Sequence, residues 1–378
     1  MDINQRMLDL NINQVYNLIK TIGRKRTVLV EGHMGSGKTS IGRMLAADLK
    51  ETHTFVYFDC TTKDLMDLGA PKVMRWDETG EEYLTMVPNE ELGLHLQRPV
   101  ILMFDEIGKN KGIINGVRRI LLERTVHGKK LHPDSIVFAT TNLGSENVGD
   151  IFPAHSRNAI TVVRMRKSTA EEWVEDFAVN AGIHPALIAW VLREAPHVFQ
   201  SFEDVTATGK DIDSDVDKGG NPYIYHPKAV GRTAFFTHRS AEAASDYMHF
   251  REELDATTFH AALAGTVGVR AASDLVSYMK IADDMPSSED IKENPKTAKI
   301  PSNPAAVCMV IMRTLNTLDR TWINAWMDYM VRLDPIEQAL FSNSVRSEKY
   351  KQRELVMTNR KYTDWSLQNQ HMHQADKK

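Results

Sequence analysis

A glycine-rich segment near the start of the chain has the residue types and spacing of a phosphate-binding loop. It runs from Gly32 to Thr39 and reads Gly-His-Met-Gly-Ser-Gly-Lys-Thr, a glycine followed by four residues and then Gly-Lys-Thr. Glycines allow consecutive backbone N–H groups to converge on phosphates, and the N-terminus of a following helix adds partial positive charge. We therefore expect a nucleoside triphosphate, most favourably ATP, to contact nine residues: Gly32, His33, Met34, Gly35, Ser36, Gly37, Lys38, Thr39 and Ser40.

Two side chains at the end of this segment suit the charged parts of ATP and its magnesium ion. Lys38 is expected to reach the β- and γ-phosphates, and the Thr39 hydroxyl is expected to hold Mg²⁺. The loop follows an apolar run and opens a stretch suited to a helix, which is the context that the motif requires. A glycine-rich turn that binds nothing is the alternative interpretation.

Two adjacent acids close another apolar run. Asp105 and Glu106 directly follow Val100 to Phe104. Open α/β sheets bind ligands outside the carboxyl ends of their strands, so these acids are expected in the same crevice as the loop. Asp105 would bind the Mg²⁺ shell and Glu106 would polarise the attacking water. The alternative is that the two acids cap the helix that follows.

An amide closes the next apolar run, in the sequence Ala139-Thr140-Thr141-Asn142. At the end of a strand beside the phosphate-binding strand, Asn142 could orient water against the γ-phosphate. Asparagine at a strand end is also a common turn former. The residue by itself leaves both interpretations open.

The elements that must position these residues follow an α/β pattern. Five short runs are almost continuously apolar, as expected for strands covered by helices on both faces: Thr27 to Val30, Phe55 to Phe58, Val100 to Phe104, Ile136 to Ala139 and Ile160 to Val163. Helix-length stretches separate them, as at Thr39 to Lys50 and Ile113 to Glu123. The predicted fold class is therefore α/β, with a parallel sheet.

After Met165 the pattern becomes helical. Thr169 with Glu172, or Ser168 with Glu171, offers a capping box. Later helical candidates and two intervening loops are spread over the second half of the chain: helices at Ser240 to Leu254, Thr257 to Leu263, Gly268 to Lys280 and Ala305 to Leu333, and loops at Phe202 to Tyr225 and Ala282 to Pro304. The second loop contains four prolines and is expected to be a linker.

Composition is that of an ordinary globular protein. The 378 residues are 42% hydrophobic and 25% charged, with a net charge of −4, which does not favour nucleic acid as the partner. Two cysteines far apart in sequence suit a reducing compartment, and no apolar run is long enough to span a membrane. We expect a cytoplasmic protein without a membrane partner; the family resemblance described below further implies a bacterial or phage-infected bacterial cell.

Taken in order, the loop, Asp105-Glu106, Asn142, Arg157 and Arg239 resemble the ordered motifs of the AAA+ ATPases. The resemblance implies that Asn142 is the sensor 1 residue, that Arg157 is the finger inserted into the neighbouring subunit's site, and that Arg239 is sensor 2 in a lid domain. Two positions depart from the family pattern, because Asn158 replaces the usual aromatic residue and His238 stands where proline is common. Four other arginines remain rivals: Arg118, Arg119, Arg124 and Arg232.

The segment from Lys72 to Val87 is expected to form a hairpin turning near Asp77 to Gly80. It resembles the hairpin inserted into the second helix in the MoxR branch of the AAA+ family, and the resemblance extends over roughly residues 25 to 310. In such ATPases this region faces a central pore or a client. Trp76, Tyr83 and Met86 would contact the client, or would pack the hairpin onto its own domain; both interpretations stay open.

The resemblance also implies a domain organisation and a function. Residues 1–166 would form the nucleotide-binding P-loop NTPase domain, 167–284 a smaller α-helical lid domain, and 285–378 a linker and helical C-terminal segment with a polar basic tail. The leading hypothesis is an ATPase that forms a homo-oligomeric ring, with a hexamer expected, and remodels a protein client. The alternatives are a nucleic-acid motor or loader and an ATP-gated scaffold with little turnover. Adjacent Asp105 and Glu106 argue against the scaffold.

Overall fold

The computed structural model describes residues 9–109, 111–143, 158–207, 220–226, 229, 231–282 and 285–369. The chain divides into two compact units, Met1–Lys167 and Ser168–Lys378. Buried apolar side chains form two clusters in the first unit and one in the second. Each unit therefore has its own core.

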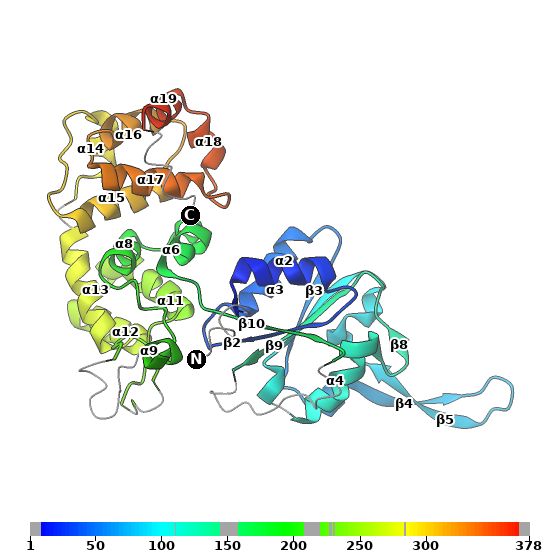
Figure 1. Ribbon diagram of the computed structural model, residues 1–378. Coiled ribbons are helices and arrows are strands. Elements are labelled where there is room, and N and C mark those ends of the chain that lie inside the picture. The colour runs from blue at the N-terminus through cyan, green and yellow to red at the C-terminus, as the bar shows by residue number, and fades with distance from the viewer. Residues whose placement is uncertain are drawn as a thin grey trace. The chain divides into compact units, whose positions relative to one another are not determined.

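The first unit is built on a parallel sheet (Figure 1). The strand order is β1-β10-β2-β9-β6-β3, so the strand before the loop lies inside the sheet and β3 lies at one edge. The strands are β1 (Asp9–Leu10), β2 (Val28–Gly32), β3 (Thr54–Asp59), β6 (Val100–Asp105), β9 (Ile136–Asn142) and β10 (Thr161–Met165). All pairings between neighbours are parallel. The five strands expected from the sequence are confirmed.

Helices cover both faces of the sheet. Val28 and Val30 of β2 pack with α2 (Ile12–Ile22) and α3 (Lys38–Asp48), whereas Leu29 packs in the other cluster with α4 (Lys111–Glu123). Figure 1 shows α2 and α3 on one side of the sheet and α4 on the other. This arrangement explains the continuous apolar runs, because successive residues of a strand point to opposite faces and both faces are buried.

Short elements connect the main strands. They are the 3-10 helices η1 (Leu65–Leu68), η2 (Glu90–Leu92), η3 (Leu94–Leu96) and η4 (Ile107–Lys109), and the two-residue strands β7 (Thr125–Val126) and β8 (Lys129–Lys130). Between η1 and η2 lies an antiparallel hairpin of β4 (Gly69–Arg75) and β5 (Glu82–Pro88). The predicted hairpin is therefore confirmed, and in Figure 1 it extends away from the sheet of its own unit.

The second unit is helical. Its helices in the described residues are α6 (Ala170–Trp173), η6 (Val174–Ala178), α7 (Val179–Ala181), α8 (Pro185–Arg193), α9 (Phe202–Ala207), α11 (His238–His249), η7 (Arg251–Glu253), α12 (Ala256–Val267), α13 (Val269–Ala282), α14 (Ser288–Glu293), α15 (Pro304–Thr317), α16 (Ile323–Met330), α17 (Pro335–Arg346), α18 (Arg353–Met357) and α19 (Arg360–Gln368). Thr169 caps α6 through the predicted capping box with Glu172. One apolar cluster runs from Ala170 to Trp365 and includes residues on both sides of position 284.

Three details of this unit differ from the sequence expectation. The stretch Ala305 to Leu333 is two helices, because Leu318 is extended and the Asp319 carboxylate accepts the backbone N–H of Thr321. The expected linker contains α14, whose Ile291 is fully buried. The loop expected at Phe202 to Tyr225 begins with the helix α9. The helical C-terminal segment, in contrast, is present as expected in α18 and α19, where Trp365 is buried and its Nε1 donates to Gln338 over 2.8 Å.

Candidate nucleotide site

The glycine-rich loop connects β2 to α3, as the motif requires. Gly35 has a φ of 71° and Gly37, which precedes the first residue of α3, has a φ of 90°. These left-handed conformations strain any residue with a Cβ atom, so glycine is needed at both positions. Gly32 is needed for a different reason, since a Cβ atom there would lie 2.9 Å from the carbonyl oxygen of Met165 on β10.

Lys38 is the first residue of α3, and its side chain contacts the loop. Its buried ammonium donates to the carbonyl oxygens of Gly32 over 2.7 Å and of His33 over 2.8 Å, and to Oδ1 of Asn142 over 2.9 Å. Asn142 is close because it ends β9 directly opposite Gly32 in the strand register. The structure thus brings together the loop lysine and the predicted sensor amide.

Asp105 ends β6 and accepts hydrogen bonds from three hydroxyl groups. Thr39 Oγ1 donates to its Oδ2 over 3.0 Å, Tyr57 donates to the same oxygen over 2.9 Å, and Thr140 donates to Oδ1. The carboxylate is 6% exposed. The two residues expected to hold Mg²⁺, Thr39 and Asp105, are therefore in direct contact. Burial and the hydrogen bond to Asp105 together raise the pKa of Tyr57.

Glu106 has an unusual backbone conformation, with a φ of 52°. Its backbone N–H donates to Thr140 Oγ1 over 3.2 Å, which ties the strand end to β9. Its carboxylate forms an ion pair with Lys109, three residues further on. In this arrangement the predicted catalytic carboxylate is neutralised by a cation of its own segment.

The residues of the loop fit a phosphate chain and its metal ion. Within the part of the chain that the structure describes, Ser36 Oγ is buried in the loop without a hydrogen-bond partner. The Lys38 ammonium donates to the carbonyl oxygens of Gly32 and His33 at the start of the loop and to Asn142. Among the described residues no group of three or more His, Cys, Asp or Glu side chains could hold a metal ion. A hydroxyl and one carboxylate nevertheless suit Mg²⁺, which is commonly bound by one or two carboxylates together with substrate phosphates.

The two predicted arginines belong to other parts of the chain. Arg157 is among the residues that the structure does not describe. Arg239 is exposed near the start of α11 in the helical unit. Arg124, a rival for the finger, is instead a structural residue of the α/β unit. Its guanidinium donates to backbone carbonyls that include Gly23 and Leu121, and burial lowers its pKa to about 10.

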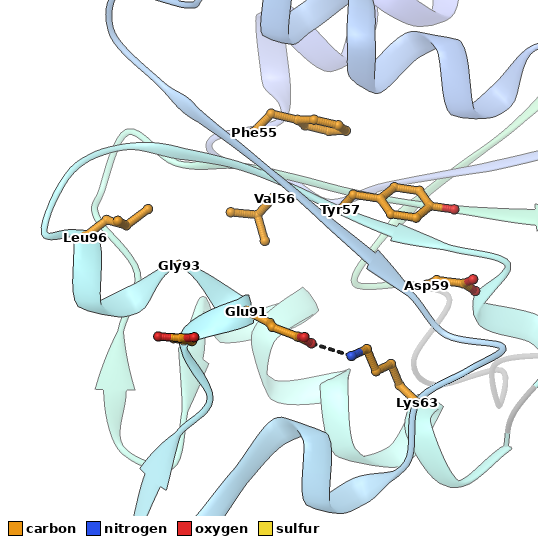
Figure 2. Close-up of a pocket in the computed structure, with 9 residues that line it drawn as sticks. Phe55, Val56, Tyr57, Asp59, Lys63, Glu91, Gly93 and Leu96 are labelled. Atoms are coloured by element: carbon orange, nitrogen blue, oxygen red, sulfur yellow. Dashed lines mark hydrogen bonds and ion pairs between the residues drawn. The ribbon is translucent and has the colours of Figure 1, made fainter.

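A cavity of about 390 Å³ lies beside β3 (Figure 2). It is formed between the edge strand β3 and the segment that contains η2 and η3. Phe55, Val56 and Tyr57 of β3 line one side, and the Lys63–Glu91 ion pair lies opposite. None of the residues proposed to bind nucleotide lines this cavity, so we do not assign it to the phosphates.

Three contacts of the site were not anticipated from the sequence. Tyr57 and Thr140 hold Asp105, and Lys109 pairs with Glu106. Thr140 belongs to the same segment as Asn142. Its hydroxyl, two residues before the end of the strand, could have indicated a contact at the site. For Tyr57 the signal was absent, because the sequence does not show that β3 pairs with β6.

Comparisons with known proteins give only remote likenesses. No protein-family model matches the chain, and no curated protein matches it. Among solved structures, a protein of Cytophaga hutchinsonii titled as a putative ATPase is similar over 43% of this chain and 47% of its own, with 16% identity and a TM-score of 0.29. NtrX from Brucella abortus is similar over 89% of this chain and 68% of its own, with 15% identity and a TM-score of 0.34. The chain thus spans about half the length of the first.

The class of protein follows from the fold and the loop of the chain itself. A parallel sheet covered by helices, with a glycine-rich loop between β2 and α3, is followed by a helical unit. The fold class expected from the sequence, an α/β P-loop NTPase core followed by helical segments, is confirmed. Within the described residues, every helix is too short or too polar to cross a bilayer.

The tight strand contact at Gly32 gives a stability prediction. Gly32→Ala would place a Cβ atom against the Met165 carbonyl and should lower the free energy of unfolding by about 1–3 kcal/mol. The matched control is Gly265→Ala in α12, where a Cβ atom meets nothing within 4 Å and where alanine should stabilise the helix by about 0.5–1 kcal/mol. Denaturant unfolding of both variants checks this pair, and equal effects would contradict the contact at Gly32.

Proposed function

We propose that this chain is an ATPase of the AAA+ type, resembling the MoxR branch, that couples ATP hydrolysis to the remodelling of a protein client. The observation that carries the proposal is the meeting of Lys38, Thr39, Asp105 and Asn142 at the carboxyl ends of three neighbouring strands and the start of α3. Phosphate-binding lysine, metal-binding hydroxyl and metal-binding acid are the parts that P-loop NTPases use.

Each of these side chains has a distinct part in the proposed reaction. Lys38 exchanges the carbonyl oxygens of Gly32 and His33 for phosphate oxygens, while Asn142 keeps the ammonium aligned. Thr39 and Asp105 hold Mg²⁺, which when bound neutralises charge on the phosphates. Glu106 accepts the proton of the attacking water after its carboxylate separates from Lys109.

The proposed reaction is tested by a pair of variants at the site. Glu106→Gln should bind ATP with the affinity of the parent but turn it over about a hundredfold or more slowly, because the amide keeps the shape of the side chain and lacks its basicity. Lys38→Ala should lose ATP binding itself, because no cation remains for the phosphates. Fluorescent-nucleotide binding and phosphate release measure the two properties. Turnover by Glu106→Gln at the parent rate would remove Glu106 from the mechanism.

We also propose that the chain acts as a homo-oligomeric ring, with a hexamer expected. The support is the resemblance of the segment around Arg157 to the finger of AAA+ ATPases, in which an arginine of one subunit completes the site of the next. A head-to-tail contact of identical subunits generates a ring when its rotation closes. An arginine on the γ-phosphate accelerates phosphoryl transfer by about a thousandfold or more.

Mixing two inactive variants tests the ring. Arg157→Ala should bind ATP without turnover, and Lys38→Ala should fail to bind it. A mixture creates interfaces that combine an intact loop from one variant with an intact finger from the other, so ATPase activity should reappear. Steady-state phosphate release across mixing ratios is the measurement, with light scattering to verify mixed assemblies. Mixed assemblies without activity would contradict a finger at Arg157.

The β4–β5 hairpin is the surface that we propose for the client. Its strands expose apolar side chains on both faces: Val73 and Leu84 are opposite each other on one face, and Met74 and Trp76 lie on the other. Leu84 is 68% exposed and Trp76 is 56% exposed. Trp76 packs on Tyr83 of the same hairpin, with ring centroids 4.5 Å apart, rather than in the core of its unit. Exposed apolar surface of this kind favours a protein partner over DNA, which binds chiefly through cations.

A capture experiment tests the hairpin. The Glu106→Gln chain loaded with ATP should recover a client protein from a lysate, and Trp76→Ala in the same background should recover several-fold less. Because Trp76 is exposed, its replacement should remove only the contact with Tyr83 and lower the free energy of unfolding by about 0.5–1.5 kcal/mol. Phe250→Ala is the matched control, since Phe250 is 57% exposed in the helical unit. Equal recovery by all three chains would contradict the hairpin's role, and recovery of DNA instead would favour the nucleic-acid motor.

A further inference from the structure

A tyrosine outside the loop motifs contacts the acid that is proposed to hold the metal. The Tyr57 hydroxyl donates to Oδ2 of Asp105 over 2.9 Å, and the same oxygen accepts from Thr39 Oγ1 over 3.0 Å. We propose that Tyr57 is a positioning residue, whose hydroxyl orients the Asp105 carboxylate so that Oδ2 stays beside Thr39 for metal binding. This inference rests on the proposed nucleotide site and adds to it a residue from the edge strand.

The strand register explains why a tyrosine can make this contact. Asp59 of β3 is paired with Asp105 of β6, and Tyr57 is two residues before Asp59. Side chains two residues apart lie on the same face of a strand, so Tyr57 and Asp105 face the same side of the sheet as diagonal neighbours. A diagonal neighbour is farther away than the directly opposite residue, and a long aromatic side chain can bridge that separation.

Close packing of α3 completes the arrangement on this face. A Cβ atom at Gly42 of α3 would lie 2.7 Å from Cζ of Phe55 and 2.8 Å from Sδ of Met103, so glycine lets the helix approach β3 and β6. Thr39 belongs to the first turn of the same helix. The approach of α3 therefore brings the Thr39 hydroxyl to the carboxylate on the side that Tyr57 also reaches.

The two oxygens of Asp105 have different partners. Oδ1 is held by Thr140, and Oδ2 is shared by Thr39 and Tyr57. The terminal torsion of an aspartate is broad, so hydrogen-bond donors decide how its carboxylate is turned. Thr39 has a second task as a proposed metal ligand, whereas Tyr57 is free of that task. Tyr57 can thus keep Oδ2 in place while Thr39 binds the metal.

Tyr57 also differs from the two threonines in its surroundings. Tyr57 lines the cavity beside β3 (Figure 2) and is 46% exposed. Thr140 is fully buried. Removing the phenolic oxygen leaves the ring in place and opens no void in a packed core. Tyr57→Phe should therefore change the stability of the fold little, while it removes one hydrogen bond to the Asp105 carboxylate.

The experiment compares nucleotide affinity with and without a metal ion. In the Glu106→Gln background, a fluorescent ATP analogue is titrated in saturating Mn²⁺ and again in EDTA. Tyr57→Phe should weaken binding in Mn²⁺ by about tenfold, since groups that orient a metal ligand contribute about that much to metal affinity. Binding in EDTA should be unchanged. The matched control is Tyr16→Phe, which removes a hydroxyl that donates to Asp48 over 2.7 Å on the same unit.

Each other outcome overturns the inference in a recognisable way. Equal weakening in Mn²⁺ and EDTA, or a lower melting temperature with unaltered metal discrimination, would make Tyr57 a structural contact only. Unchanged binding in both conditions would make its hydroxyl irrelevant to the metal. In all three cases the parent chain still binds nucleotide, so the proposed function stands. A parent chain that binds no ATP analogue in either condition would instead remove the nucleotide site and this inference with it.

Discussion

The buried carboxylate of Asp105 is the group on which the architecture of the site depends. An ionisable group that is 6% exposed must be compensated by hydrogen bonds, and here the donors are three hydroxyl groups. They come from α3 and β3, which follow each other in the sequence, and from β9, which is distant from both. The parallel order of the sheet brings their ends together, because all the strands run in one direction and finish at one edge. One requirement, the placement of hydrogen-bond donors around the buried Asp105 carboxylate, therefore explains the sheet, the glycine-rich loop and the close approach of α3.

The same geometry explains what the sequence could and could not predict. Local signals identified the loop, because Gly35 and Gly37 need left-handed backbone and Lys38 follows at a fixed spacing. They also identified the five strands, since burial on both faces imposes continuous apolar runs. Contacts across the sheet could not be predicted, because they depend on which strands are neighbours. Tyr57 contacts Asp105 only because β3 pairs with β6. The residues of the Glu106–Lys109 ion pair are close in sequence. Each side chain has several rotamers, however, so the sequence alone does not predict that the two charges meet.

The hairpin and the helical unit show two further limits of pattern-based prediction. The hairpin was predicted from its turn. The exposure of its apolar side chains could not be predicted, because alternation along β4 and β5 does not say which face is covered. In the helical unit, the residues near the C-terminus are polar and basic in composition, yet Tyr362 and Trp365 are buried there. Two aromatic side chains were sufficient to anchor a short polar helix to the core.

The central claim is that the loop between β2 and α3 holds the phosphates of ATP. Its most direct test is a crystal structure of the Glu106→Gln chain with Mg²⁺ and ATP. We predict phosphate oxygens on the Lys38 ammonium in place of the carbonyl oxygens of Gly32 and His33, and the metal ion on the Thr39 hydroxyl beside Asp105. A nucleotide bound elsewhere, for example in the cavity beside β3, with the Lys38 contacts to Gly32 and His33 unchanged, would contradict the account.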